Sequence, residues 1–182
     1  MSKLGFDELF EAVQLAERYN LAIVSTKGMS VVAARNLLDK FAKLVDHVFV
    51  LHDFDVSGFS IMGALGTDSR RYTFESDLYE VIVDLGLRLT DIEEMGLQAE
   101  TVEVKSREAR RETLERHGAT DEEIEFRAPE DEDEDCQRVE LNAMTSRQLV
   151  DFVEGKLEFY GVAKVIPHGS STVNRCRHPV TH

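Results

Sequence analysis

The sequence has few cysteines, a shortage of basic residues and no long hydrophobic run. Its two cysteines, Cys136 and Cys176, lie far apart and form no metal-ligand spacing. We therefore expect free thiols in a reducing, cytoplasmic compartment rather than a disulfide framework. No apolar stretch approaches the roughly 18 residues of a membrane span. No signal peptide precedes the first predicted helix, so we expect no membrane partner.

Positive charge is scarce, with 21 Lys and Arg residues against 35 Asp and Glu residues and a net charge of −14. This balance argues against a broad basic surface for nucleic acid, because phosphate affinity comes from Lys and Arg. The charge is uneven, since residues 121–135 contain ten acidic residues and the single Arg127. We interpret residues 120–136 as a solvated linker or surface loop, and a DNA-mimicking or self-shielding segment is the alternative.

The sequence does contain alternating apolar strand and helix patterns, over a length that suits one domain. This alternation predicts an α/β fold with a mostly parallel sheet flanked by helices. We expect the domain to cover residues 1–166 and a disordered tail to cover residues 167–182. The predicted helices cover residues 6–19, 31–44, 56–65, 89–96, 106–117 and 145–160, and the predicted strands cover residues 21–25, 47–52, 71–74, 79–83 and 138–141.

The most informative stretch is residues 48–61, in which an apolar strand ends in Asp53-Phe54-Asp55 before a Ser-Gly turn and a helix. Side chains two residues apart on an extended chain point the same way, so Asp53 and Asp55 can converge. They would do so at the carboxyl end of a strand, where open α/β sheets bind ligands. Two carboxylates there suit Mg²⁺ or Mn²⁺. The simpler interpretation is a solvated acid pair at a strand end.

Several residues around this pair are candidate phosphate contacts, each with a simpler structural alternative. Gly58 would let a phosphate approach the backbone, or would serve helix packing. Ser57 would add a hydroxyl to the site, although a helix-capping role is favoured. Lys27 follows the predicted strand 21–25 and would be either solvated or a phosphate ligand. Arg70 and Arg71 form one small basic spot that could contact a DNA backbone.

Two further residues are candidates for a place beside the site. Glu140 lies two residues after Arg138 on a predicted strand, so we expect a salt-bridged pair. The alternative for Glu140 is an acid that flanks the site or binds a second metal ion. His52 precedes Asp53 and should face away from it, which predicts packing or a local hydrogen bond.

An ordered series of motifs resembles the Toprim domain of the topoisomerase VI A-subunit type. The series includes Gly-Phe-Asp-Glu-Leu at residues 5–9, Ala-Glu-Arg-Tyr-Asn-Leu-Ala-Ile at 16–23, Ser-Thr-Lys-Gly-Met-Ser at 25–30 and His-Asp-Phe-Asp-Val-Ser-Gly at 52–58. Asp-Leu-Gly-Leu-Arg at 84–88 and Arg-Val-Glu-Leu-Asn-Ala-Met at 138–144 are similar to bacterial and phage members. The resemblance covers residues 2 to 166.

The resemblance implies a Rossmann-like Toprim fold of the kind found in topoisomerases, primases and related nucleases. In that family the two aspartates hold Mg²⁺, and Asp53 and Asp55 match them. A glutamate at the end of the first strand works beside them, and here Ser2 stands in its place. Serine supplies neither a charge for the metal nor a ready proton acceptor. We therefore expect weak or no activity from the chain alone.

The resemblance also implies partners. Family members work as homodimers around duplex DNA, and a separate winged-helix domain carries the attacking tyrosine. The four tyrosines of this chain lie in segments typical of ordinary α/β structure, and we assign none of them as the nucleophile: Tyr19, Tyr72, Tyr79 and Tyr160. We expect a truncated or degenerate Toprim module, or one part of a split protein, that depends on a second subunit or domain.

Two other functions remain open from the sequence. A haloacid-dehalogenase-like phosphotransferase would also use Asp-x-Asp after an apolar strand, with the first aspartate as nucleophile. Such enzymes normally place the motif on their first strand. A non-catalytic interaction module that retains the fold is the other alternative, which Ser2 and the acidic segment favour.

Overall fold

The computed structural model describes residues 5–25, 31–41, 43–65 and 81–165. The chain divides into two compact units, one formed by residues 1–25 with 154–182 and one formed by residues 26–153. Several sequence predictions lie outside the described residues, namely those on Ser2, Lys27, Arg70, Arg71, Tyr72, Tyr79, Cys176, the strand 71–74 and the tail 167–182. No helix among the described residues is both long enough and apolar enough to cross a membrane.

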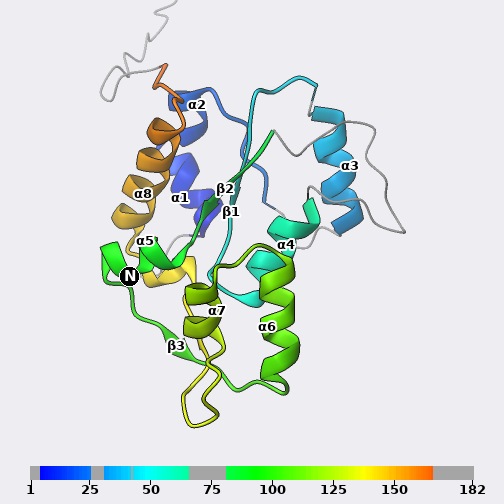
Figure 1. Ribbon diagram of the computed structural model, residues 1–182. Coiled ribbons are helices and arrows are strands. Elements are labelled where there is room, and N and C mark those ends of the chain that lie inside the picture. The colour runs from blue at the N-terminus through cyan, green and yellow to red at the C-terminus, as the bar shows by residue number, and fades with distance from the viewer. Residues whose placement is uncertain (1–4, 26–30, 42, 66–80, 166–182) are drawn as a thin grey trace, which may run out of the picture. The chain divides into compact units, whose positions relative to one another are not determined.

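The larger unit contains a parallel strand pair, as the strand–helix alternation predicts. β1 (Val48–Leu51) pairs with β2 (Ile82–Gly86), and Val50 lies opposite Asp84 (Figure 1). The register shifts after Val50, so that Leu51 lies opposite Gly86. Gly86 has φ +94°, a conformation that suits glycine. The chain is thus α/β, with the carboxyl ends of β1 and β2 side by side.

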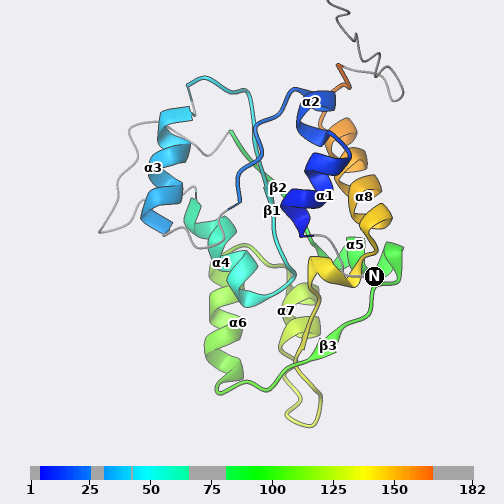
Figure 2. The same cartoon turned by 180° about the vertical axis from the view of Figure 1, so that it is seen from behind.

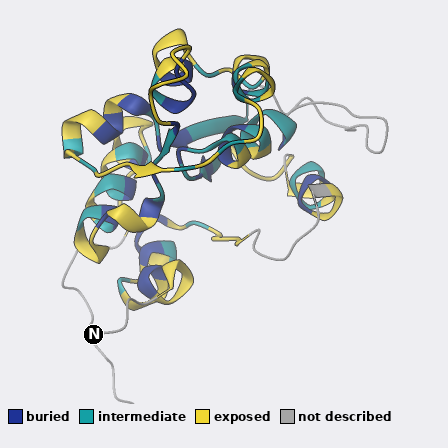
Figure 3. Ribbon diagram, turned by 90° about the horizontal axis from the view of Figure 1, so that it is seen from below, coloured by how far each residue is buried: buried dark blue, intermediate teal, exposed yellow. Residues whose placement is uncertain are grey.

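Helices cover this strand pair and provide its core. Ala34 of α3 (Val31–Phe41), Val50 of β1 and Leu65 of α4 (Val56–Leu65) form one buried cluster. Partly buried Leu38, Val48, Met62 and Ile82 pack against it. Exposed residues gather on the outer helix faces in Figure 3. The further helices are α5 (Leu89–Met95), α6 (Arg107–Arg116), α7 (Asp121–Arg127), the 3₁₀ turn η1 (Leu141–Ala143) and α8 (Ser146–Phe159).

A second, antiparallel pair is very short. β3 (Glu100–Thr101) pairs with β4 (Gln137–Arg138), and the chain after β4 reaches the end of β1. There Val139 and Phe54 exchange backbone hydrogen bonds of 2.8 and 3.2 Å. The predicted strand 138–141 is therefore shorter than expected. It brings residues 139–141 alongside the Asp53–Asp55 turn.

The acidic segment begins as a helix, which corrects the prediction of a linker or loop over residues 120–136. Residues 121–127 form α7, which lies beside α6 (Figure 2). Thr120 caps α7, and its hydroxyl accepts a hydrogen bond from the Glu123 N–H. Two charged side chains of α7, Glu123 and Arg127, are buried. The remainder is a loop, and Arg107 of α6 donates hydrogen bonds to the carbonyl oxygens of Pro129, Asp131, Glu132 and Glu134.

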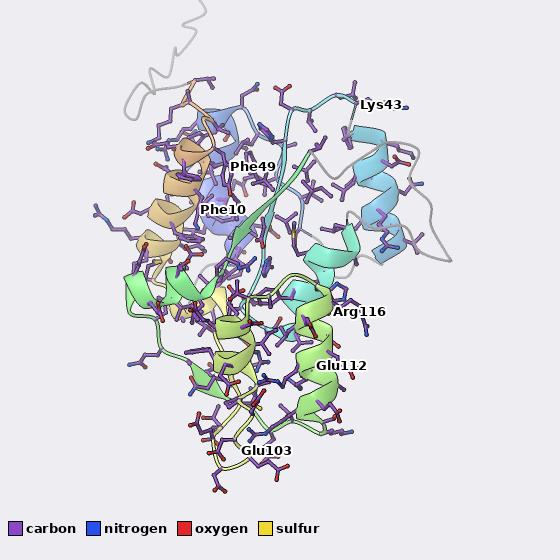
Figure 4. The ribbon with its side chains drawn as sticks, in the orientation of Figure 1. Phe10, Lys43, Phe49, Glu103, Glu112 and Arg116 are labelled. Atoms are coloured by element: carbon purple, nitrogen blue, oxygen red, sulfur yellow. The ribbon has the colours of Figure 1, made fainter. Side chains whose placement is uncertain are left out.

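Glu112 and Arg116, which Figure 4 labels on α6, lie on its exposed surface. Cys136 follows the acidic loop and is a buried free thiol, as predicted.

The smaller unit shows two departures from the predicted pattern. The predicted helix 6–19 is two helices, α1 (Phe6–Ala12) and α2 (Leu15–Tyr19), because Gln14 between them has a left-handed conformation. Residues 21–25 form no strand. Glu154 of α8 forms two ion pairs, with Arg18 of α2 at 2.5 Å and with Lys164 at 2.8 Å. Tyr19 is buried, and its hydroxyl is 3.2 Å from Glu158.

Gly58 lets the first turn of α4 lie directly against the end of β1. A Cβ atom at this position would clash with the Asp53 carbonyl oxygen and would come within 2.7 Å of His52 Nδ1. Neither group can move freely, because the His52 ring is buried and the oxygen is backbone. A packing role for Gly58 is therefore sufficient to explain the glycine.

We predict that Gly58→Ala lowers the free energy of unfolding by about 2 to 3 kcal/mol through overpacking. Urea unfolding followed by circular dichroism measures the change. Gly155→Ala is the matched control, because a Cβ atom at Gly155 in α8 would meet nothing within 4 Å. That control should be neutral or stabilising, since alanine favours a helix. An equal loss in both variants would contradict the packing role.

Candidate metal centre at the carboxyl end of β1

Asp53 and Asp55 lie in the turn between β1 and α4, and each carboxylate accepts a backbone hydrogen bond. Asp53 Oδ1 accepts from the Leu141 N–H at 2.7 Å. Asp55 Oδ1 accepts from the Gly58 N–H at 2.6 Å, which makes Asp55 the N-terminal cap of α4. The predicted capping role of Ser57 is therefore filled by Asp55, and Ser57 is exposed in the first turn.

Phe54 anchors the turn between the two aspartates. Its side chain is fully buried, and its ring centroid lies 5.6 Å from that of Phe59 and 5.8 Å from that of Phe126. Alternation along extended chain directs the neighbouring side chains away from this aromatic core. Asp53 and Asp55 are accordingly only half-buried.

The electrostatics of the turn are those of crowded negative charge. Burial raises the pKa of Asp53, and the hydrogen bond from Leu141 opposes that rise. The negative charges of Asp55 and Glu140 raise it further, so the pKa lies above its ordinary value of 3.8. Asp55 and Glu140 therefore both repel the Asp53 carboxylate, and a cation bound beside Asp53 would relieve this repulsion.

The donor set fits a sparsely liganded Mg²⁺ ion. In the described part of the chain, no group of three or more His, Cys, Asp or Glu side chains is placed to hold a metal ion. Mg²⁺ is commonly bound by one or two carboxylates and completes its shell with waters and phosphate oxygens. Asp53 and Asp55 meet that requirement, since each carboxylate has a second oxygen besides the one that accepts a backbone N–H.

Glu140 lies next to the site in an ion pair, as predicted. Its Oε1 is 3.0 Å from Arg138 Nη2, and the same nitrogen is 3.0 Å from Glu100 Oε2. Glu140 also acts electrostatically on Asp53, and its neighbour Leu141 binds that carboxylate through its N–H. The salt-bridge interpretation is confirmed, and the same residue flanks the site.

His52 forms the base of the turn, with the packing and local hydrogen bond that the sequence predicts. The ring is buried against Phe59, and Nδ1 lies 2.8 Å from the Asp53 carbonyl oxygen. Nε2 lies 3.1 Å from Asp84 Oδ1 at the end of β2. A carbonyl and a carboxylate can only accept, so this geometry favours the imidazolium, which donates from both nitrogens. Burial opposes the charge, but the bonds to Asp84 and Asp53 raise the pKa of His52.

Asp84 continues this network to the acidic segment, and sequence reasoning assigned it no role. Burial works against its ionised form, yet His52, the Gly86 N–H and Arg88 together lower the pKa of Asp84 to about 2. Arg88 reaches Asp84 at 3.0 Å and Glu123 of α7 at 2.5 Å. The four-residue spacing of Asp84 and Arg88 in the Asp-Leu-Gly-Leu-Arg motif could have indicated their ion pair from the sequence. Nothing in the sequence distinguished Glu123 from the other acidic residues of its run.

We predict that the His52–Asp84 pair contributes most to stability between pH 3.8 and pH 6.5. The raised pKa of His52 gives a contribution that is present below its ordinary 6.5 and lost as pH rises through the folded value. The depressed pKa of Asp84 gives a contribution that is present above its ordinary 3.8 and lost as pH falls towards 2. Asp84→Asn should therefore cost about 1 to 3 kcal/mol inside this window.

Urea unfolding of the wild type and Asp84→Asn across this pH range measures the difference. Asp151→Asn is the control, because the Arg147–Asp151 pair on α8 is solvent-exposed and spans 3.5 Å. Its cost should stay under about 0.5 kcal/mol at every pH. A pH-independent cost for Asp84→Asn would contradict a charged pair.

Comparison with known proteins assigns the chain to a family. A family model that describes the Toprim domain of the topoisomerase 6 A-subunit and Spo11 matches residues 4–157. The match includes β1, the Asp53–Asp55 turn, β2 and most of α8. No match is found among the curated proteins or among the solved structures. The resemblance found in the motifs is thereby confirmed, and the chain belongs to the Toprim-domain family of the topoisomerase 6 A-subunit and Spo11.

Proposed function

We propose that this chain is a Mg²⁺-binding Toprim module of a DNA topoisomerase or nuclease-type system that acts on DNA phosphodiesters. Asp53 and Asp55 hold the ion, and Mn²⁺ can replace it. The observation that supports this most is the pair of half-buried carboxylates at one strand end, where burial and, to a smaller extent, the charge of Asp55 raise the pKa of Asp53. Family membership supports the same chemistry.

The chain's own residues provide orientation. The Leu141 N–H fixes the Asp53 carboxylate and the Gly58 N–H fixes that of Asp55, so the ligands need not reorganise when a cation binds. Bound Mg²⁺ would supply charge neutralisation and polarisation of a phosphoryl oxygen. Lys27, Ser57, Arg70 and Arg71 remain predicted phosphate contacts. Gly58 also remains a predicted contact, and its missing Cβ makes room for His52 and Asp53.

We propose no nucleophile within the described residues. The Tyr19 hydroxyl is bonded to Glu158, and burial raises the pKa of Tyr19, with smaller opposing effects from Lys164. A buried phenol of raised pKa is a poor nucleophile. With Ser2 in place of the expected glutamate, the chain alone should cleave DNA weakly or not at all. A second copy or a partner subunit would supply the nucleophile.

A non-catalytic interaction module is the second candidate. It is favoured by the structural use of both aspartates, since one caps α4 and the other binds the chain at Leu141. These hydrogen bonds would be enough to explain why both positions are aspartate, without any metal ion. Titration with the metal ion separates the two functions.

We predict saturable binding of Mg²⁺ or Mn²⁺ to the wild type in calorimetric titration. Asp53→Asn/Asp55→Asn should bind at least about 10-fold more weakly, because both anionic ligands become neutral amides. Asn can still accept the backbone hydrogen bonds, so circular dichroism should show a folded variant. Asp151→Asn, which removes an exposed carboxylate from α8, should leave the binding isotherm unchanged. Equal heats in wild type and double variant would contradict the metal site and favour the interaction module.

A further inference from the structure

The last residue of α7, Arg127, is a buried cation without hydrogen-bond partners for much of its guanidinium. Only 2% of the residue is exposed. Its Nε and Nη1 are buried and have no acceptor among the described residues. A buried charge normally has a partner, because leaving water without one costs several kcal/mol. Two nitrogens of this guanidinium therefore lack the acceptor that a buried cation normally has.

The fold places Arg127 beside the candidate metal centre. Its neighbour Phe126 packs against Phe54, the residue between the two aspartates, with ring centroids 5.8 Å apart. Asp55 interacts electrostatically with Arg127, as do Arg110 of α6 and Arg138 of β4. The guanidinium thus lies within electrostatic range of one of the two proposed metal ligands.

The acidic groups nearby already have other contacts. Arg138 pairs with Glu100 and Glu140, and Asp55 Oδ1 caps α4. Burial and the positive charges of Arg110 and Arg138 act against the cation, so the pKa of Arg127 falls to about 10 even with Asp55 close by. It stays charged at neutral pH. An added anion with several oxygens would satisfy Nε and Nη1 together, as a phosphate does.

We propose that Arg127 binds a phosphate group of a nucleic-acid backbone next to Asp53 and Asp55. This rests on the proposed function and deepens it, because it names the residue that recognises the phosphate. Asp53 and Asp55 bind the metal ion, and Arg127 donates N–H hydrogen bonds to the phosphate oxygens. Since the side chain is almost fully buried, binding requires a local rearrangement around the end of α7.

The direct test is NMR of the Arg127 Nε–H signal in the wild-type chain, assigned with Arg127→Lys. The probes are inorganic phosphate and a 12-nucleotide DNA strand without a terminal phosphate, each with Mg²⁺. We expect the Nε–H resonance to shift saturably with the DNA strand. A shift with inorganic phosphate alone would overturn the nucleic-acid assignment. No shift with either probe would overturn the phosphate site.

A variant series gives an independent measurement. We expect Arg127→Met to reduce affinity for the DNA strand about 10- to 100-fold in fluorescence anisotropy, and Arg127→Lys to reduce it less. Arg147→Met is the matched control, because its side chain is 91% exposed on α8, and it should lower affinity by less than about 2-fold.

Stability distinguishes a binding residue from a structural one. Loss of an unpaired buried charge should leave the Tm of Arg127→Met unchanged or higher. A large fall in the Tm of Arg127→Met, together with a wild-type Nε–H resonance that shifts with neither probe, would show that Arg127 has only a structural role.

The outcomes also separate this inference from the proposed function. Loss of Mg²⁺ binding in Asp53→Asn/Asp55→Asn, with unaltered DNA affinity in Arg127→Met, would overturn only the role of Arg127. DNA binding that depends on Arg127, without Mg²⁺ binding to the wild type, would overturn only the metal site.

Discussion

The buried His52 ring connects the acidic turn after β1 to the end of β2, and the candidate site depends on this connection. One nitrogen contacts the Asp53 carbonyl oxygen at the start of the acidic turn, and the other contacts Asp84 at the end of β2. Both partners are acceptors, so the arrangement is fully satisfied only by a charged ring. The first turn of α4 fits over this ring because Gly58 has no Cβ atom. A larger residue would displace the turn that carries both aspartates.

The two aspartates have a structural role, to which the proposed metal site would add a chemical one. Each carboxylate accepts one backbone N–H, and these bonds set the direction of the side chains before any ligand arrives. The two carboxylates also repel each other. Burial is the main reason why the pKa of Asp53 is raised, and the negative charge of Asp55 raises it further. Preorganised negative charge of this kind is what a cation site requires. Because the same two carboxylates also accept structural hydrogen bonds, sequence spacing alone cannot tell a metal-binding acid pair from a structural one.

The acidic segment has two parts with opposite physical roles. Its first part is α7, which buries Glu123 against Arg88 and places Arg127 near the site. Its second part is a loop whose carbonyl oxygens are held by Arg107, and residues 130–135 are exposed. A high density of acids thus does not prevent a helix, because Thr120 caps it and the acids of its first turn favour its N-terminus. The charge run alone could not separate the buried acid from the exposed ones.

Sequence patterns predicted several helices and the strand β1 of the larger unit, together with the position of the acid pair, but missed the break between α1 and α2 and the helix α7. Helix α4 begins and ends at the predicted residues, and β1, α5, α6 and α8 differ from their predictions by no more than one residue at either end, because apolar periodicity and caps act over short distances. Sequence also predicted the Arg138–Glu140 pair and the local bonding of His52. Tertiary structure decided the rest. The links from His52 to Asp84, from Arg88 to Glu123 and from Asp53 to Leu141 join residues that are 32, 35 and 88 positions apart. Periodicity carries no information over such separations, since only packing brings those partners within hydrogen-bond distance.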